Sequence, residues 1–248
     1  MENYKINSRD ENLHFIPTRS YYKLLKSLKY FQKKRGIILH VVGAPGTGKS
    51  TNIYHAFEER GLNVYEASLV LDHPYLTPRM VFNFTLESMK DDLKVKTDEE
   101  LYQRLKEFDA VLFADKFHDS HLLNDNTSGF SQWTAHNGWK TFPYYLFCLG
   151  EYMKRRKEFN DINIVLQTAW RINTGGKKRD LFTDLGPISK ASLFFLKIPF
   201  SVVEISYSPA ETISIVKSHV EDADEDRIRT YIDLYGCKPR LICEAIKN

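Results

Sequence analysis

The sequence predicts an α/β fold in which helices cover a parallel sheet and a small helical unit follows. Two observations predict it. Five apolar runs of strand length alternate with helical stretches, at residues 37–42, 62–66, 110–115, 161–168 and 201–205. After Pro209 only helical patterns remain. We therefore expect an N-terminal arm and helix (1–36), a sheet domain (37–207) and a helical lid (208–248).

The composition shows no strong bias toward one class of partner. The 248 residues suffice for one sizeable α/β domain with a small appendage, and 42% hydrophobic and 27% charged residues are ordinary proportions for a globular protein. The net charge of +3 and the pI of about 8.6 lie below the level that by itself indicates a nucleic-acid-binding protein. Any contact with nucleic acid must therefore depend on local clusters of charge.

The sequence also lacks signals for a membrane or secretory location. No apolar run approaches the roughly 20 residues that a membrane span needs, and the N-terminus has no apolar segment typical of a signal peptide. Cys148, Cys237 and Cys243 have no metal-ligand spacing, and their small, odd number is typical of reduced thiols. We expect a cytoplasmic protein that does not bind a membrane.

The first helix is expected at residues 19–34, after a polar arm. Tyr22, Leu25 and Leu28 would form its apolar face. The other side carries six basic residues, which are Lys23, Lys26, Lys29, Lys33, Lys34 and Arg35. The favoured interpretation of these charges is the solvated face of a packed helix.

A phosphate-binding motif follows the first apolar run. Its residues are Gly43, Ala44, Pro45, Gly46, Thr47, Gly48, Lys49, Ser50 and Thr51, and a helical stretch follows at residues 52–60. A strand, then G-x-x-x-x-G-K-S, then a helix is the context in which this pattern cradles phosphates. The glycines let successive backbone N–H groups converge on an anion, and the helix N-terminus adds partial positive charge. A plain glycine-rich turn is the disfavoured alternative.

Three side chains complete the predicted site for ATP and Mg²⁺. Lys49 would reach the β- and γ-phosphates, and the Ser50 hydroxyl would ligate the metal. Asp115 ends the third apolar run, at the carboxyl end where open α/β sheets place their ligands. We expect Asp115 to hold the metal through water, opposite Ser50. The alternative is an aspartate that only opens the next turn.

The middle of the chain is predicted from local signals. Thr77 is a good N-cap for a helix to about residue 93, and Thr97 opens a capping box for a second helix to about residue 108. Residues 119–139 are rich in Asn, Ser, Gly and His and form a long loop. Residues 142–159 are predicted as one helix.

That helix ends in a basic cluster formed by Lys154, Arg155, Arg156 and Lys157. Two interpretations remain open. The cluster could compensate the partial negative charge at the end of the helix, or it could contact the phosphate backbone of a nucleic acid. A second basic segment, at residues 174–179, is predicted as a flexible loop.

The C-terminal helices, at about 210–220, 224–235 and 239–246, carry one further candidate residue. Arg240 lies in the first turn of the last helix, just after Pro239. An arginine gains nothing from the positive end of a helix dipole. Its position therefore suggests a ligand rather than a contribution to helix stability.

These features together resemble an AAA+ ATPase module from about residue 37 to the C-terminus. The resemblance implies a P-loop αβα sandwich with a five-stranded parallel sheet in the order 5-1-4-3-2 and a small helical lid. It is greatest to replication initiators, helicase loaders and archaeal signalling ATPases. Gly236, Pro239 and Arg240 look like the sensor-2 motif of the lid. By the same resemblance Gln167 or Thr168 would occupy the sensor-1 position.

The resemblance also has implications for assembly and partners. It implies a homo-oligomer in which Arg179, or with less support Arg171, is the arginine finger offered to a neighbouring subunit. It implies ATP hydrolysis in DNA replication or another nucleic-acid transaction. Whether the partner is DNA, RNA or a protein stays open from the residues alone.

One residue departs from the pattern of that family. A glutamate follows the metal-binding aspartate in the family and activates the attacking water, whereas this chain has Lys116, whose ammonium cannot act as a general base. Asp119 is the nearest downstream carboxylate that could replace it, and Glu66 is a poorer candidate. We expect slow basal hydrolysis. The alternatives are a small-molecule kinase and a nucleotide-binding switch with little hydrolysis.

Overall fold

The computed structural model describes residues 15–67, 77–114, 142–174 and 177–247, and its main feature is a parallel sheet. The strands are β1 (Ile38–Val42), β2 (Val64–Glu66), β3 (Val111–Ala114), β4 (Ile164–Thr168) and β7 (Ser201–Glu204). Their order is β2-β3-β4-β1-β7, and the paired strands run parallel. In the numbering of the five predicted strands this order is 5-1-4-3-2. The predicted fold class and strand order are confirmed.

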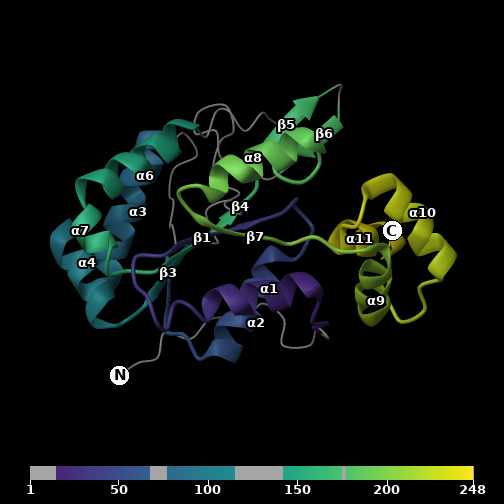
Figure 1. Cartoon of the computed structure of the whole chain (residues 1–248), viewed down its shortest axis with the longest axis horizontal. Helices are drawn as coiled ribbons and strands as arrows, with labels where there is room; N and C mark the ends of the chain where they lie inside the picture. The colour runs from purple at the N-terminus through teal and green to yellow at the C-terminus, as the bar shows by residue number, and fades with distance from the viewer. Residues whose placement is uncertain (1–14, 68–76, 115–141, 175–176, 248) are drawn as a thin grey trace.

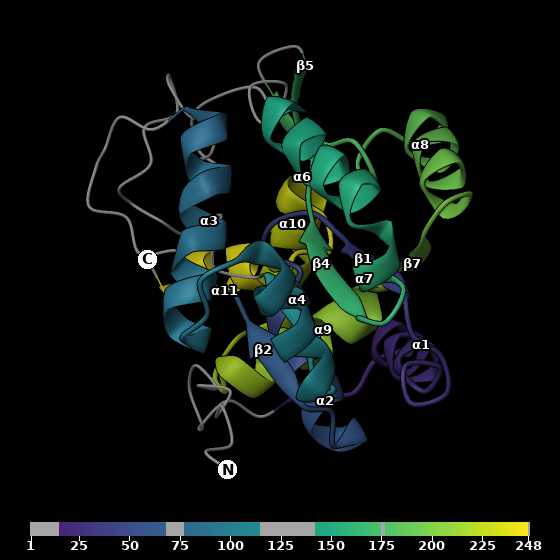
Figure 2. The ribbon, with the colours of Figure 1, turned by 90° about the vertical axis from the view of Figure 1, so that its left-hand side faces the viewer.

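Helices cover both faces of this sheet (Figures 1 and 2). One face packs against α1 (Arg19–Leu28) and α2 (Lys49–Arg60), and the other against α3 (Pro78–Leu93), α4 (Asp98–Glu107), α6 (Phe142–Lys154) and α7 (Arg156–Phe159). Successive side chains of a strand point to opposite faces. Accordingly Leu39 of β1 packs in the α1–α2 layer and Ile38 in the other layer.

The last three helices pack around an apolar cluster of their own. They are α9 (Pro209–His219), α10 (Glu225–Tyr235) and α11 (Pro239–Lys247), and Figure 1 shows them beside the sheet, after β7. Their shared core contains Ile213, Val216, Ile228 and Ile242. Among the described helices, none has the length and apolar character needed to cross a bilayer.

The predicted starts of α3 and α4 are confirmed because they rest on local hydrogen bonds. Thr77 caps α3 by accepting a bond from the Met80 N–H, and Thr97 and Glu100 form the reciprocal capping box of α4. α2 begins at Lys49, earlier than predicted, because Gly48 adopts the left-handed conformation at its N-cap. The backbone therefore enters the helix directly from the phosphate loop.

Two predicted segments are wrong in their local structure. The helix expected at 142–159 is interrupted at Arg155, whose φ of −116° and ψ of 36° separate α6 from α7. The segment 174–179, expected as a flexible loop, belongs to an antiparallel hairpin of β5 (Arg171–Thr174) and β6 (Lys177–Asp180). The break at Arg155 coincides with its ion pair to Glu99 on α4, whereas the two strands of the hairpin pair with each other.

Two further features of the helices differ from the expectation. Tyr22 is 60% exposed, whereas its neighbour Tyr21 is buried, so the apolar face of α1 is formed by Tyr21, Leu24, Leu25 and Leu28. α8 (Pro187–Lys197) was not expected, and it packs beside β7 through Leu193. Its exposed side carries the apolar residues Ile188, Phe194 and Phe195.

A buried asparagine joins α1 and the following turn to the sheet. Asn163, 1% exposed, accepts a hydrogen bond from the Ile37 N–H at 3.1 Å. Its amide nitrogen donates to the carbonyl oxygens of Phe31 and Lys34, each at 3.1 Å. This one side chain therefore satisfies three backbone groups of the segment that enters β1.

Replacing Asn163 with alanine should lower the free energy of unfolding by about 3 kcal/mol, because buried backbone groups that lose their partner cost roughly 1–3 kcal/mol. Urea unfolding followed by circular dichroism measures the difference. Asn160→Ala is the matched control, since the Asn160 side chain is exposed. Equal stability of the two variants would contradict the structural role of Asn163.

His40 of β1 is a largely buried group that titrates. Its Nδ1 lies 2.9 Å from Oγ1 of Thr168, and its ring packs against Phe200. Burial lowers the pKa of His40 from 6.5 to about 4. The unfolded chain therefore takes up a proton below pH 6.5 that the folded chain excludes until about pH 4.

The wild type should thus lose about 2 kcal/mol of stability through His40 between pH 7 and pH 5, because each pKa unit of difference corresponds to about 1.4 kcal/mol. His40→Gln removes the titrating group and keeps a polar partner for Thr168. The difference between the free energies of unfolding of the two proteins, measured in urea, should change by about 2 kcal/mol between the two pH values. All other titrating groups are common to both proteins. A difference in the free energy of unfolding that does not change with pH would therefore contradict the lowered pKa of His40.

Candidate nucleotide-binding site

The phosphate loop lies at the carboxyl end of β1, a strand with a paired neighbour on each side, and leads into α2. Gly46 and Gly48 have φ values of 85° and 69°, which are rarely adopted by residues with a side chain. Backbone N–H groups held in such a turn, together with a helix N-terminus, form an anion-binding concavity. The local backbone therefore has the form that the motif predicts.

The carbonyl groups of the loop are hydrogen-bonded by other parts of the molecule. Tyr207, between β7 and α9, donates its hydroxyl to the Thr47 carbonyl at 2.7 Å. The Asn52 amide donates to the Gly48 carbonyl at 2.8 Å and to the Tyr207 oxygen at 2.9 Å. The backbone N–H of Arg240 donates to the Gly46 carbonyl at 3.2 Å. These bonds hold the carbonyls in place without using the loop N–H groups.

Lys49, the proposed phosphate ligand, is buried in this structure. Its ammonium donates to the carbonyl oxygens of Gly43 at 2.8 Å and Ala44 at 3.1 Å. The side chain is 5% exposed. The Lys49 ammonium therefore lies against the loop that is expected to bind phosphate. A short movement of the flexible Lys49 side chain would break these two bonds and let the ammonium contact an anion.

The polar end of β4 meets the start of α2. The Ser50 hydroxyl donates to Oε1 of Gln167 at 2.8 Å. Thr168 points to the opposite face, where it contacts His40. Of the two residues considered for the sensor-1 position, Gln167 contacts the start of α2 through its side chain, whereas Thr168 meets the phosphate loop through its carbonyl, which accepts from the Gly43 N–H at 3.3 Å.

The predicted metal site is only partly described. The structure places Ser50 at the N-terminal end of α2, whereas Asp115, Lys116 and Asp119 lie outside the described residues. Within the described part of the chain, no group of three or more His, Cys, Asp or Glu side chains could hold a metal ion. The hydroxyl of Ser50 and the amide oxygen of Gln167 are oxygen donors of the kind that suits Mg²⁺.

The lid touches the phosphate loop, but its arginine does not reach it. Beside the backbone bond from Arg240, the Leu241 side chain lies 3.1 Å from the position that a Cβ on Gly46 would take. The Arg240 guanidinium instead pairs with Glu244 at 2.9 Å, and its side chain is 74% exposed. The sensor-2 role of Arg240 would therefore require a change of rotamer.

A second contact ties the lid to the segment after the hairpin. The Lys238 ammonium pairs with Asp184 at 3.0 Å, with both side chains 19% exposed. Asp184 in turn accepts a hydrogen bond from the Asp180 N–H at 3.1 Å. The turn before α11 is thus linked to β6 through Lys238, Asp184 and Asp180, and α11 itself is bonded to the phosphate loop through the Arg240 N–H.

The two finger candidates lie on the hairpin. Arg171 is in β5 and Arg179 in β6, and the Arg179 side chain is exposed. Figure 1 shows the hairpin projecting near α8, at the edge of the molecule. An exposed arginine at an edge can be offered to another molecule, and nothing in a single chain tests this role.

Two groups near the site were not predicted from the sequence. Tyr207 follows the last strand, and no local pattern distinguishes it from other tyrosines. Asp180 is fully buried and accepts bonds from the N–H groups of Trp170 and Phe182. Burial raises the pKa of Asp180 to about 6, and the positive charge of Lys49 opposes that shift. A buried carboxylate close enough to interact with Lys49 adds to the electrostatics of the phosphate loop.

One of the predicted phosphate-backbone contacts is corrected by the structure. The Arg155 side chain is 8% exposed and pairs with Glu99 at 2.7 Å and Glu151 at 3.0 Å. Its guanidinium is therefore committed to carboxylates and unavailable to a phosphate. Lys154, Arg156 and Lys157 are exposed, and their role stays a prediction.

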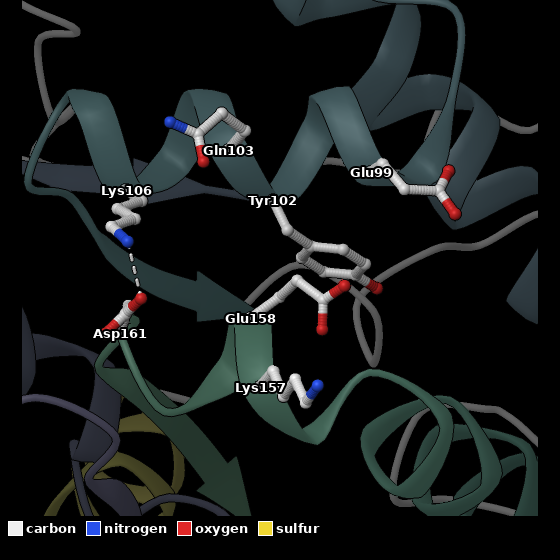
Figure 3. A pocket seen from close by; sticks show the side chains of 7 residues that line it. All are labelled: Glu99, Tyr102, Gln103, Lys106, Lys157, Glu158 and Asp161. Carbon is white, nitrogen blue, oxygen red and sulfur yellow. Dashed lines mark hydrogen bonds and ion pairs between the residues drawn. The ribbon is translucent and has the colours of Figure 1, made fainter.

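Carboxylates also surround the remainder of that cluster. A pocket of about 250 Å³ lies between α4 and α7. Figure 3 shows Lys106 pointing to Asp161, with which it pairs at 2.6 Å, and Lys157 near Glu158. Both sides of the pocket carry charges of both signs, so it is no site for a highly charged ligand.

Comparison with known proteins gives no match in sequence and only distant likenesses in structure. No family model and no curated protein matches the sequence. Among solved structures, the chain is similar to a Walker-type ATPase of Pyrococcus abyssi, with 14% identity and a TM-score of 0.49, over 95% of this chain and 68% of that one. It is also similar to AMPPCP-bound DnaA from Aquifex aeolicus, with 16% identity and a TM-score of 0.42, over 94% of this chain and 62% of that one. At these values the likenesses do not bear on activity, which must be argued from the site itself.

Proposed function

We propose that the chain is a Mg²⁺-dependent AAA+-like ATPase with slow basal turnover. The observation that carries the proposal is the phosphate loop itself, which joins an internal strand to α2 with Lys49 stored against it and Ser50 bonded to Gln167. The loop N–H groups and the start of α2 would bind the triphosphate. Lys49 would leave the Gly43 and Ala44 carbonyls for the β- and γ-phosphates.

The other residues of the site have proposed roles. Ser50, together with Asp115 outside the described residues, would hold Mg²⁺, which would supply charge neutralisation at the phosphates. Gln167 would orient the attacking water, since its amide oxygen already lies within hydrogen-bond distance of Ser50. Arg240 would leave Glu244 and turn toward the γ-phosphate when the lid closes on a nucleotide.

Slow turnover follows from the chemistry of the residue after Asp115. Lys116 cannot remove a proton from water, and a positioned base contributes roughly 10²–10⁴ in rate. Asp119 would take this role if the segment beyond Asp115 brings it to the site. A nucleotide-binding switch with little hydrolysis is the limiting case of the same proposal.

The proposed partners are a second copy of the chain and a nucleic acid or protein on which the ATPase acts, as in DNA replication. Arg179 lies exposed on a hairpin at the edge of the molecule, which suits an arginine finger acting on the site of a neighbour. Such a finger stabilises the charge that develops on the transferred phosphoryl group. The active form would then be an oligomer.

Lys49→Ala should reduce ATP turnover by about 10²–10³-fold, the usual effect of removing one group that stabilises charge in the transition state. Phosphate release and binding of a fluorescent ATP analogue measure the effect, and circular dichroism checks the fold. Lys197→Ala, at an exposed lysine of α8, is the matched control and should behave as wild type. Undiminished hydrolysis by the Lys49 variant would refute the proposed site.

Arg179→Ala and Lys49→Ala proteins should each be inactive alone and regain some activity when mixed. Each would supply what the other lacks, because a finger acts in trans and contributes about 10³–10⁵ in rate. Phosphate release at a fixed total concentration measures the recovery, and wild-type activity per chain should rise with concentration. Turnover that is independent of concentration, without recovery on mixing, would show that each chain works alone.

A further inference from the structure

The positive charge of the chain is concentrated around α1. Residues 19–35 contain seven of the 35 basic residues and no acidic residue. The formal charge of the whole chain is only +3, so the rest of the sequence carries net negative charge. Any polyanion that approaches this protein therefore meets its main positive field at α1.

The basic side chains of this segment share one face. Tyr22, Lys26 and Lys29 follow one another at helical spacing, and Lys33 lies in the turn that continues from α1. Lys26, Lys29, Tyr30 and Lys33 line a hollow of about 220 Å³. Three ammonium groups thus border one concave surface, with an aromatic ring among them.

These lysines are not neutralised within the part of the chain that the structure describes. Among the described residues, none of Lys23, Lys26, Lys29, Lys33 and Lys34 forms an ion pair, whereas the neighbouring Arg35 pairs with Asp109. Like charges close together repel one another, and a bound polyanion removes that repulsion. The surface therefore has more positive charge than folding requires.

The surface is also held in place. The opposite face of α1 is buried in the core through Leu24, Leu25 and Leu28. The turn after α1 is fixed by Asn163, which bonds the carbonyls of Phe31 and Lys34. A charged surface on a rigid element loses little conformational entropy when a ligand binds.

We propose that this face of α1 and its turn, Tyr22 to Lys34, binds the backbone and bases of single-stranded nucleic acid. Tyr22 and Tyr30 are 60% and 53% exposed, and exposed rings among lysines allow bases to stack while phosphates meet the ammonium groups. A membrane surface fits less well, because the apolar face of α1 is buried and cannot enter lipid. The inference rests on the part of the proposed function that gives the ATPase a nucleic-acid partner.

This assignment moves the nucleic-acid surface away from residues 154–157. Arg155 is bound to carboxylates there, and Lys157 lies in a pocket with Glu99, Glu158 and Asp161, as Figure 3 shows. Acidic neighbours repel phosphates and reduce the field of each lysine. Both segments are basic in sequence. Carboxylates also contact the α1 segment, at Tyr21, Arg35 and the Arg19 N–H, but among the described residues they leave its five lysines unpaired.

The test is fluorescence anisotropy with a labelled oligothymidylate of 20 nucleotides, without ATP, over a range of salt. The triple variant Lys26→Gln, Lys29→Gln and Lys33→Gln should weaken binding and reduce the slope of log K against log salt by about 2, since each single-strand phosphate contact contributes roughly 0.7. Tyr30→Leu should weaken binding by roughly 5- to 100-fold, the usual range for losing one base stack.

Matched controls separate position from overall charge. The variant Lys154→Gln, Arg156→Gln and Lys157→Gln removes the same charge and should change affinity by no more than about twofold. Tyr235→Leu, at another exposed tyrosine, should have no effect. Circular dichroism of the α1 variants should match wild type, because the substituted side chains are exposed.

The outcomes are distinct. Equal losses in the two triple variants would show a general charge effect and overturn the assignment to α1. Equal affinity for duplex DNA, or binding to anionic lipid vesicles but not to the oligonucleotide, would overturn the single-strand partner. Lys49→Ala protein should bind the oligonucleotide as wild type does, so a failure of the ATPase proposal is measured separately from a failure of this one.

Discussion

The candidate nucleotide site depends on where the carbonyl groups of the phosphate loop find partners. An anion-binding loop must direct N–H groups inward, so its carbonyls must turn outward and be satisfied elsewhere. Here the partners come from three directions. Asn52 on α2 holds Gly48, Tyr207 beyond β7 holds Thr47, and the backbone of α11 holds Gly46. The loop is therefore shaped by the whole molecule and not by its own sequence alone.

This arrangement joins the lid to the chemistry of the loop. Because α11 donates to the Gly46 carbonyl, any opening of the lid removes one of the bonds that shape the phosphate site. Lys238 adds a second contact, an ion pair with Asp184. Asp184 accepts a hydrogen bond from the N–H of Asp180, and the buried carboxylate of Asp180 interacts with Lys49. The lid position and the charge around Lys49 are thus connected through a few short contacts.

The features predicted from the sequence are those encoded locally. The five apolar runs and the capping residues Thr77 and Thr97 each act within a few residues, and the structure has the five strands and both caps. The motif around Lys49 lies between β1 and α2, and its role in binding phosphate stays a prediction. Arg155 was misjudged because its partner Glu99 lies 56 residues away, on α4. The hairpin and α8 were missed because strand pairing and the packing on β7 select them, and local propensity does not.

Hydrogen bonds link α1 to the phosphate loop through Ser206 and Tyr207. The Ser20 hydroxyl donates to the Ser206 carbonyl at 2.7 Å and accepts from the Ser206 N–H at 3.2 Å. The next residue, Tyr207, holds the Thr47 carbonyl of the phosphate loop. A ligand that displaces α1 must therefore either break the bonds at Ser206 or move Tyr207 and, with it, the loop. A nucleic acid bound on the exposed face of α1 therefore leaves this geometry unchanged unless it displaces the helix, which the buried apolar face of α1 opposes.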